Sequence, residues 1–259
     1  MEGVSLEPLN IKKESNKEEL KNFLSAFQLD FDEDIDYTIV CRIKGEIVAT
    51  ASTAGNILKC FAISEAYRNR GILEALNSKL MDRLFQKGIY HYFIFTTPEK
   101  FKAFSSMGYN LVYQAEKVVL LEHGIYTIEE RLLAIAESYN IEDNLNRVVL
   151  VIYPNFLKEE IVEEIKALEV KFSEVLVFLS EEFFEQISGY FSEDDLKVKF
   201  IKEFDYFFSY EVFPRYFIRN EEERKQAYKQ ISLGIIEKYI FKLIKFKMIY
   251  FYEGISKWN

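Results

Sequence analysis

The chain has 259 residues, 49% of them hydrophobic and 29% charged, and carries 33 basic and 42 acidic side chains. This length suits two domains, and an apolar content that includes 24 Phe and 17 Tyr excludes intrinsic disorder. The resulting net charge of −9 argues against nucleic acid or an anionic membrane as the main partner.

The N-terminus, the apolar stretches and the cysteines bear on the cellular location of the protein. The N-terminus lacks the apolar segment of a signal peptide, and no stretch is apolar over the length needed to span a membrane. The two cysteines, Cys41 and Cys60, lie in apolar runs, where a small buried thiol is the usual case. We therefore expect free thiols and a cytoplasmic location.

The first elements are a helix and a hairpin. Apolar spacing predicts a helix over Asn16–Ala26. Two strands are predicted at Tyr37–Arg42 and Glu46–Ser52, joined by a Lys-Gly turn. Between helix and hairpin lies the acidic segment 31–36 (FDEDID). Its carboxylates lack the spacing of a metal loop, so we expect them to be solvated and predict no metal site.

A strand, a basic turn and a helix follow, and the rest of the chain is interpreted around them. Ile57–Ile63 reads as a buried strand, Arg68-Asn69-Arg70-Gly71 as a turn, and apolar residues then recur at helical spacing from Ile72 to Leu84. A helix N-terminus attracts phosphate, and glycine lets the backbone approach it closely. The stretch is either a diphosphate site or an ordinary turn with solvated arginines.

The turn resembles a family signature. Residues 68–73 are similar to the Arg/Gln-x-x-Gly-x-Gly/Ala motif of the GNAT acyl-CoA-dependent N-acyltransferases, although Leu73 stands where the family has Gly or Ala. The resemblance implies that acetyl-CoA or CoA is the cofactor and that strand and turn residues bind it. The pantetheine side would be Phe61, Ala62 and Ile63, and the pyrophosphate side Arg68, Asn69, Arg70, Gly71, Ile72 and Leu73.

The next elements complete a GNAT-like domain over residues 1–122. A strand is predicted at Tyr90–Thr96, a short helix within 98–108, and a last strand at Asn110–Leu121. The family tyrosine that protonates the departing thiolate corresponds to Phe104, which has no hydroxyl.

No catalytic residue is assigned. Glu65 follows the strand that precedes the turn, but a loop glutamate is expected at the surface. His91 reads as a core histidine, and nothing in the sequence lowers the pKa of Cys60.

Strands and helices alternate in the second half, after a connecting segment over 123–147. Its helix is expected to bury Ile128, Leu132, Leu133, Ile135 and Ala136. Residues 148–259 then predict a small Rossmann-like parallel α/β domain, and the fold class is α/β, a GNAT-like mixed sheet followed by this domain. The predicted strands are Val148–Tyr153, Val175–Leu179, Val198–Phe204 and Lys247–Tyr252, and the predicted helices Glu159–Leu168, Glu181–Ile187 and Glu221–Leu243.

Three segments extend the resemblance to the citrate lyase ligases: residues 55–60, Phe93–Thr96 and Phe213–Ile218. That family joins a GNAT-like part to a nucleotidyltransferase-like part and uses ATP to acetylate a thiol on a carrier protein. The family's phosphate turn carries glycine and histidine, whereas Tyr153–Leu157 carries neither. The resemblance therefore implies a degenerate nucleotidyltransferase-like domain, and ATP is not expected.

Two functions from different classes remain open. The first is an acyl-CoA-dependent N-acetyltransferase acting on a small-molecule or carrier-protein substrate. The alternative is a non-catalytic module that binds CoA or a phosphopantetheine arm, or another protein. The apolar strand at Met248–Tyr252 leaves an edge or face to cover, which predicts a homodimer.

Overall fold

The computed structural model describes residues 5–139, 141, 145–152, 158–179, 181–192, 197–202, 213–240, 248–252 and 257–258. The chain forms two compact units: unit 1 comprises Met1–Thr127 and Pro214–Ile231, and unit 2 comprises Ile128–Phe213 and Ser232–Asn259. The sequence assigned residues 214–231 to the second domain, and the structure instead places them in unit 1.

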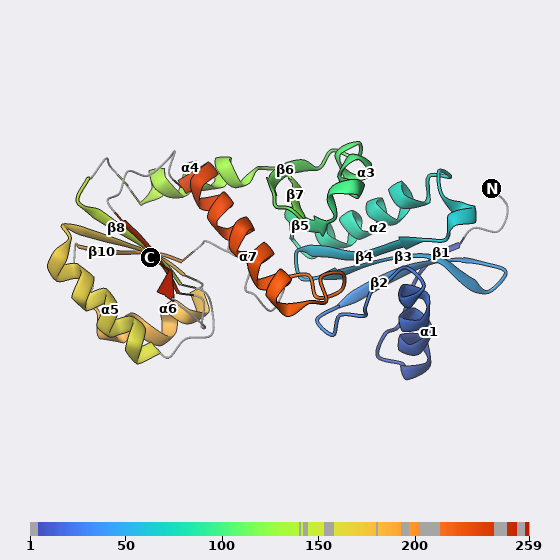
Figure 1. Ribbon diagram of the computed structural model, residues 1–259, viewed down its shortest axis with the longest axis horizontal. Helices are drawn as coiled ribbons and strands as arrows, with labels where there is room; N and C mark the ends of the chain where they lie inside the picture. Colours follow the sequence, from blue (N-terminus) through green and yellow to red (C-terminus); the bar gives the residue numbers. More distant parts are fainter. Residues whose placement is uncertain are drawn as a thin grey trace. The chain divides into compact units, whose positions relative to one another are not determined.

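Unit 1 is built on a seven-stranded mixed sheet with the strand order β1-β2-β3-β4-β5-β7-β6 (Figure 1). Neighbouring strands are antiparallel except β4 and β5, which are parallel. The strands are β1 Ser5–Pro8, β2 Tyr37–Ile43, β3 Glu46–Ala54, β4 Ile57–Ile63, β5 His91–Thr96, β6 Asn110–Gln114 and β7 Val119–Gly124.

Helices cover both faces of this sheet. Helices α1 (Glu14–Ser25) and α2 (Ile72–Gln86) lie on opposite faces, as Figure 1 shows. Alternate residues of β2 divide between them, because side chains of a strand point to opposite faces: Ile39 packs with the α2 leucines, and Val40 packs with those of α1. A short helix, α3 (Phe101–Ser105), follows β5.

Two features of the sheet differ from the expectation. Strand β1 was not predicted, because its four residues SLEP show no apolar alternation. The expected single strand Asn110–Leu121 is a hairpin, β6 and β7, closed where the Ala115 amide donates to the Val118 carbonyl over 2.8 Å. The polar pair Glu116-Lys117 marks this turn in the sequence.

Unit 2 has a five-stranded sheet with the order β10-β9-β8-β11-β12, in which all pairs except β11–β12 are parallel. This agrees with the expected Rossmann-like arrangement. The strands are β8 Arg147–Ile152, β9 Glu174–Phe178, β10 Val198–Ile201, β11 Met248–Tyr252 and β12 Lys257–Trp258. The helices are α4 Ile128–Ser138, α5 Lys158–Lys171 and α6 Glu181–Ile187, with shorter turns at Ser188–Tyr190 and Ile236–Ile240. Helix α7 (Glu221–Ile235) begins in the part of the chain that belongs to unit 1 and ends in unit 2.

Several expectations for this half need comment. β11 lies between β8 and β12, so it is not the edge strand that suggested a homodimer, and the dimer stays a prediction. Leu133, expected inside, is 43% exposed, whereas Ile128, Leu132 and Ile135 are buried. The turn 153–157, the end of the strand expected at 198–204 and the end of the helix expected at 221–243 lie outside the described residues.

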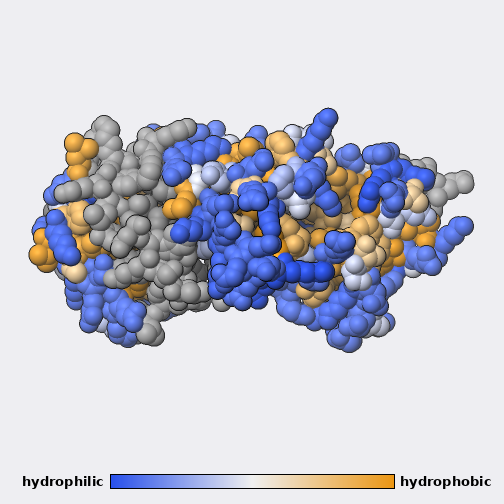
Figure 2. Space-filling model, in the orientation of Figure 1, coloured by the Kyte–Doolittle hydropathy of each residue, from blue (hydrophilic) through white to orange (hydrophobic). Residues whose placement is uncertain are grey.

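Across the described ranges, no helix is both long and apolar enough to cross a bilayer. Figure 2 shows hydrophilic side chains along the outer face of α7, where Glu221, Glu222 and Glu223 are exposed.

Candidate functional site

The parallel strands β4 and β5 pair over a short distance and then separate. Their register contains only Ile57↔Phe93 and Leu58↔Ile94, although both strands continue beyond these residues. Backbone groups that leave a ladder need other partners or a ligand. The separation therefore opens a gap in the sheet beside the second half of β4.

A bulge in β4 accompanies the separation. Opposite β3, Lys59 pairs with Ser52 and Ala62 pairs with Thr50, so two residues of β4 face one of β3. Cys60, the first residue of the bulge, has a φ of 57°. A bulge bends its strand and re-aims the adjacent side chains, which turns β4 away from β5 at this point.

A pocket of about 510 Å³ lies at the separation. It is bordered by β4 and β5, by the turn before α2, and by α3. Of the nine residues named from the sequence, eight line it: Phe61, Ala62, Ile63, Arg68, Asn69, Gly71, Ile72 and Leu73. Arg70 does not; its guanidinium lies over the Tyr67 ring, 5.3 Å from the centroid.

The turn before α2 presents backbone amides to the pocket. Gly71 takes the N-cap position in a left-handed conformation (φ 73°), and no side chain caps the helix. The first helical hydrogen bond runs from the Ala75 amide to the Gly71 carbonyl, over 3.1 Å, so the amides of the first turn have no helical acceptor. A Cβ at Gly71 would meet no heavy atom within 4 Å, and the mouth is open.

Charges of both signs surround this mouth. Arg68 lies at the surface and donates to the Ile63 carbonyl over 3.4 Å, and the exposed Lys100 lines the pocket from the α3 side. Glu74, in the first turn of α2, adds a carboxylate. Leu73 packs partly against the α2 core cluster, so its side chain is shared between core and pocket. The arrangement suits an anion at the backbone of Gly71.

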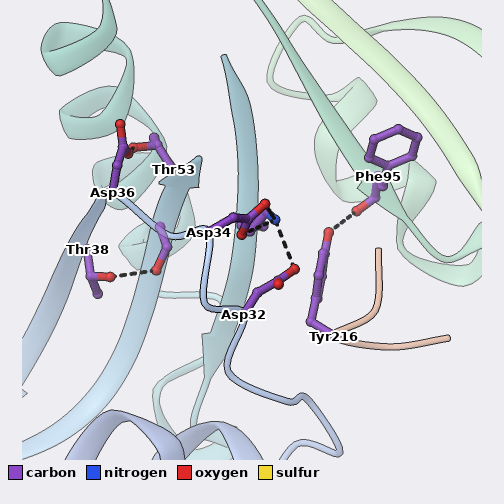
Figure 3. A network of polar contacts seen from close by, with 9 residues as sticks. Asp32, Asp34, Asp36, Thr38, Thr53, Phe95 and Tyr216 are labelled. Carbon is purple, nitrogen blue, oxygen red and sulfur yellow. Dashed lines mark hydrogen bonds and ion pairs between the residues drawn. The ribbon is translucent and has the colours of Figure 1, made fainter. Parts of the chain in front are cut away.

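Aromatic side chains line the pocket away from this turn. Phe27 and Leu29 come from the segment after α1, and Tyr216 and Phe217 come from the part of the chain that returns to unit 1. The Tyr216 hydroxyl donates to the Phe95 carbonyl on β5 over 2.9 Å (Figure 3). Burial holds the pKa of Tyr216 well above its usual value, so the hydroxyl stays neutral.

A buried ion network supports the same region. The Lys59 ammonium, whose side chain is fully buried, donates to Asp32 over 3.0 Å and to both oxygens of Asp34 over 2.8 Å (Figure 3). It also lies 5.6 Å from the centre of the Tyr216 ring. Asp36 accepts from Thr53 over 2.6 Å. The expectation that residues 31–36 are simply solvated is wrong for Asp32 and Asp34, because a lysine inside an apolar strand requires counter-ions.

The three side chains considered as catalytic candidates lie in different surroundings. Cys60 lines the pocket, but burial raises the pKa of its thiol to about 12, which leaves it a poor nucleophile. Glu65 is at the surface and makes only a loose ion pair with Arg68 over 3.7 Å. His91 is confirmed as a core histidine, 2.7 Å from the buried Glu122.

Phe104 lines the pocket and stacks edge-on against Phe61, with 5.3 Å between ring centres. Sequence reasoning missed Lys100 and Tyr216. The segment that carries Tyr216 was recognised as family-specific, but no local pattern linked it to the pocket.

The parallel pair that separates beside a bulge, together with the open helix N-terminus, defines unit 1 as GNAT-like in fold. Comparison with known proteins narrows the relationship. A family model for the citrate lyase ligase C-terminal domain matches residues 186–256. A [citrate [pro-3S]-lyase] ligase from Haemophilus influenzae is 28% identical over 231 residues, which cover 85% of this chain and 68% of that protein. The chain is thus a relative of the citrate lyase ligases.

Two further matches cover parts of the chain. The Escherichia coli [citrate [pro-3S]-lyase] ligase is 30% identical over 130 residues, 49% of this chain and 36% of that protein. An acetyltransferase of the GNAT family from Staphylococcus aureus Mu50 aligns with a TM-score of 0.41 and 16% identity, over 48% of this chain and 100% of that chain.

Proposed function

We propose that unit 1 binds an acyl thioester of the CoA type and acts as a GNAT-type acyltransferase. The observation that carries the proposal is the separation of β4 and β5 beside a pocket that begins at the Gly71 turn. The diphosphate would lie on the amides of the first turn of α2, with Arg68 and Lys100 as nearby cations. The pantetheine arm would follow β4 through Phe61, Ala62 and Ile63, where the strand no longer pairs with β5.

Transfer to an amine would be direct, with no acyl-enzyme, because the pKa of Cys60 keeps the thiol protonated. The amine nitrogen attacks the thioester carbon and releases a proton to water, and the carbon–sulfur bond breaks. The departing thiolate takes up a proton from water, since Phe104 has no hydroxyl to supply one. The acceptor is a small molecule or a group on a carrier protein. We expect no ATP-dependent step, because the segment 153–157 lacks glycine and histidine.

A second candidate is a module that binds the same thioester or a phosphopantetheine arm without turnover. It is favoured by Phe104 in place of a hydroxyl-bearing residue and by the aromatic wall at Tyr216. Both candidates use the same pocket and differ only in chemistry.

The test is a calorimetric titration of the full chain with acetyl-CoA, CoA and ATP, combined with a thiol-release assay against a panel of amines. Binding of acetyl-CoA together with amine-dependent release of CoA supports the acyltransferase. Binding without release supports the binding module. Absence of binding to both acetyl-CoA and CoA contradicts both, and tight binding of ATP contradicts the expectation for the second half.

A further inference from the structure

The pocket ends in an aromatic wall that the chain supplies from a distant segment. Lys59 precedes Ile63 by four residues and the bulge at Cys60 lies between them, so the two are at most roughly 13 Å apart along β4. At the Lys59 end of this stretch, Tyr216 and Phe217 pack in one cluster with Cys60, Ala62, Phe27 and Leu29. Tyr216 and Phe217 form the aromatic wall. A thioester arm that enters at Gly71 and follows β4 would therefore meet this wall with its acyl end.

Tyr216 is held firmly in the wall. Its side chain is 4% exposed, its hydroxyl donates to the Phe95 carbonyl over 2.9 Å, and its own carbonyl accepts from the Asp30 amide over 3.0 Å. Three residues further on, Arg219 forms a bidentate pair with Asp30, with both distances 2.8 Å. Backbone, hydroxyl and ion pair all fix one position, so the depth of the pocket is set by a rigid element.

The charges behind the wall bear on the acyl group as well. One ammonium, Lys59, is already satisfied by the two carboxylates Asp32 and Asp34. A further carboxylate brought to this end would be repelled by the aspartates and would find no unpaired cation among the described residues that line the wall. An uncharged acyl group meets no such penalty.

We propose that Tyr216, assisted by Phe217, is the residue that limits the acyl group, and that the pocket takes short, uncharged acyl chains. The inference rests on the proposed function, because it concerns the acyl end of a bound thioester. Tyr216 acts here through its shape: its ring closes the pocket, and its hydroxyl holds the ring against β5.

The experiment measures the affinity of the full chain for CoA, acetyl-CoA, hexanoyl-CoA and succinyl-CoA by calorimetry. We expect the native protein to bind acetyl-CoA about tenfold or more tightly than the hexanoyl and succinyl thioesters. The Tyr216→Ala variant should lose most of the discrimination against hexanoyl-CoA and keep that against succinyl-CoA. The Tyr216→Phe variant retains the ring and should keep both.

Two further variants make the result interpretable. Tyr109→Phe removes another buried tyrosine hydroxyl, bonded to Asn77 over 2.6 Å and outside the pocket, and should leave every affinity unchanged. Phe217→Ala widens the same wall at a less buried position and replaces Tyr216→Ala if that variant does not fold.

The outcomes separate the two ideas. Equal affinity of the native protein for acetyl-CoA and hexanoyl-CoA, or unchanged discrimination in both alanine variants, overturns the assignment of Tyr216 and leaves the proposed function standing. Failure of the native protein to bind either CoA or acetyl-CoA overturns both.

Discussion

Lys59 is the residue that overturns the interpretation of Asp32 and Asp34 as solvated carboxylates. In the sequence it is the single charge in a strand that is otherwise apolar, and in the structure its side chain is fully buried. Its counter-ions, Asp32 and Asp34, come from a loop that precedes it by more than two dozen residues, across two strands. The sequence contained both halves of this network but no signal that pairs them, because the pairing depends on the fold.

Lys59→Met should destabilise the protein by about 3 kcal/mol, because it leaves the mostly buried Asp32 and the more exposed Asp34 without their cation. Lys87→Met is the matched control: Lys87 pairs with Asp36 over 2.9 Å at the surface, and losing that pair should cost about 0–1 kcal/mol. Urea unfolding at neutral pH measures both.

The cost of Lys59→Met should also shrink as the pH falls. Burial raises the pKa of Asp34, so the folded state favours its neutral form and acid removes the unpaired charge. Equal costs for the two lysines would contradict the buried network.

Cys60 should resist alkylation in the folded protein. Burial raises the pKa of its thiol to about 12, so the thiolate is scarce at any pH at which the protein is normally studied. Cys41 is buried too, and burial also raises the pKa of its thiol. Mass spectrometry after iodoacetamide treatment should find both cysteines unmodified in the native protein and both modified in denaturant. Rapid modification of Cys60 alone in the folded chain would mean that the pocket exposes a reactive thiol.

At the scale of elements, the sequence predicted most of unit 1 and most of the described part of unit 2. Long periodic segments such as α2 and β4 were placed within a few residues, because their own side chains determine their type. What failed was local and weakly patterned: β1, with four residues, and the β6–β7 hairpin, whose turn carries neither glycine nor proline. The pocket residues on β4 and α2 were found because one motif carries them, whereas Lys100 and Tyr216 lie on other elements.

Gly71→Ala tests the turn between β4 and α2. The left-handed conformation at Gly71 makes a side chain there unfavourable by about 1–2 kcal/mol, while the open space around it lets the variant fold. The added methyl also stands where a diphosphate would approach the first amides of α2, so we expect acetyl-CoA affinity to fall about tenfold.

Gly45→Ala provides the control for this change. Gly45 has a φ of 87° in the β2–β3 turn and equally open surroundings, so alanine should cost similar stability without any loss of binding. Calorimetry measures the acetyl-CoA affinity of both variants, and urea unfolding measures their stability. A parallel loss of affinity in both would indicate that strain, and not the approach of the ligand, is responsible.

At the scale of the whole molecule, unit 1 is built from two stretches that are far apart along the chain. Residues 214–231 belong to unit 1, although some 86 residues of unit 2 separate them from Thr127. Sequence patterns report on neighbours along the chain, so they could identify Phe213–Ile218 as distinctive without showing where it packs. The place of this segment follows from a contact over a long separation, that of the Tyr216 hydroxyl with the Phe95 carbonyl. The Lys117–Glu223 ion pair is a second such contact of residues 214–231.

A chain ending at residue 212 should therefore lose part of unit 1 as well as part of unit 2. The Asp30 amide, which donates to the Tyr216 carbonyl over 3.0 Å, would lose its acceptor, and loss of a hydrogen bond worth about 1 kcal/mol raises hydrogen exchange several-fold. The aromatic wall would disappear with it, so Phe27 and Leu29 become exposed. Hydrogen–deuterium exchange of the segment around Asp30, in full-length and shortened chains, measures the effect.

The amides of the β2–β3 ladder serve as the internal control for that measurement, since they pair within residues 37–54 and should stay protected in both chains. If the Asp30 segment exchanges at the same slow rate after truncation while the ladder remains intact, residues 214–231 are not part of unit 1 in solution. The wall at Tyr216 would then have to be reassigned. If the Asp30 segment exchanges faster after truncation while the β2–β3 ladder stays protected, the pocket depends on residues 214–231. Binding should then be assayed with the full chain and not with a fragment of residues 1–127.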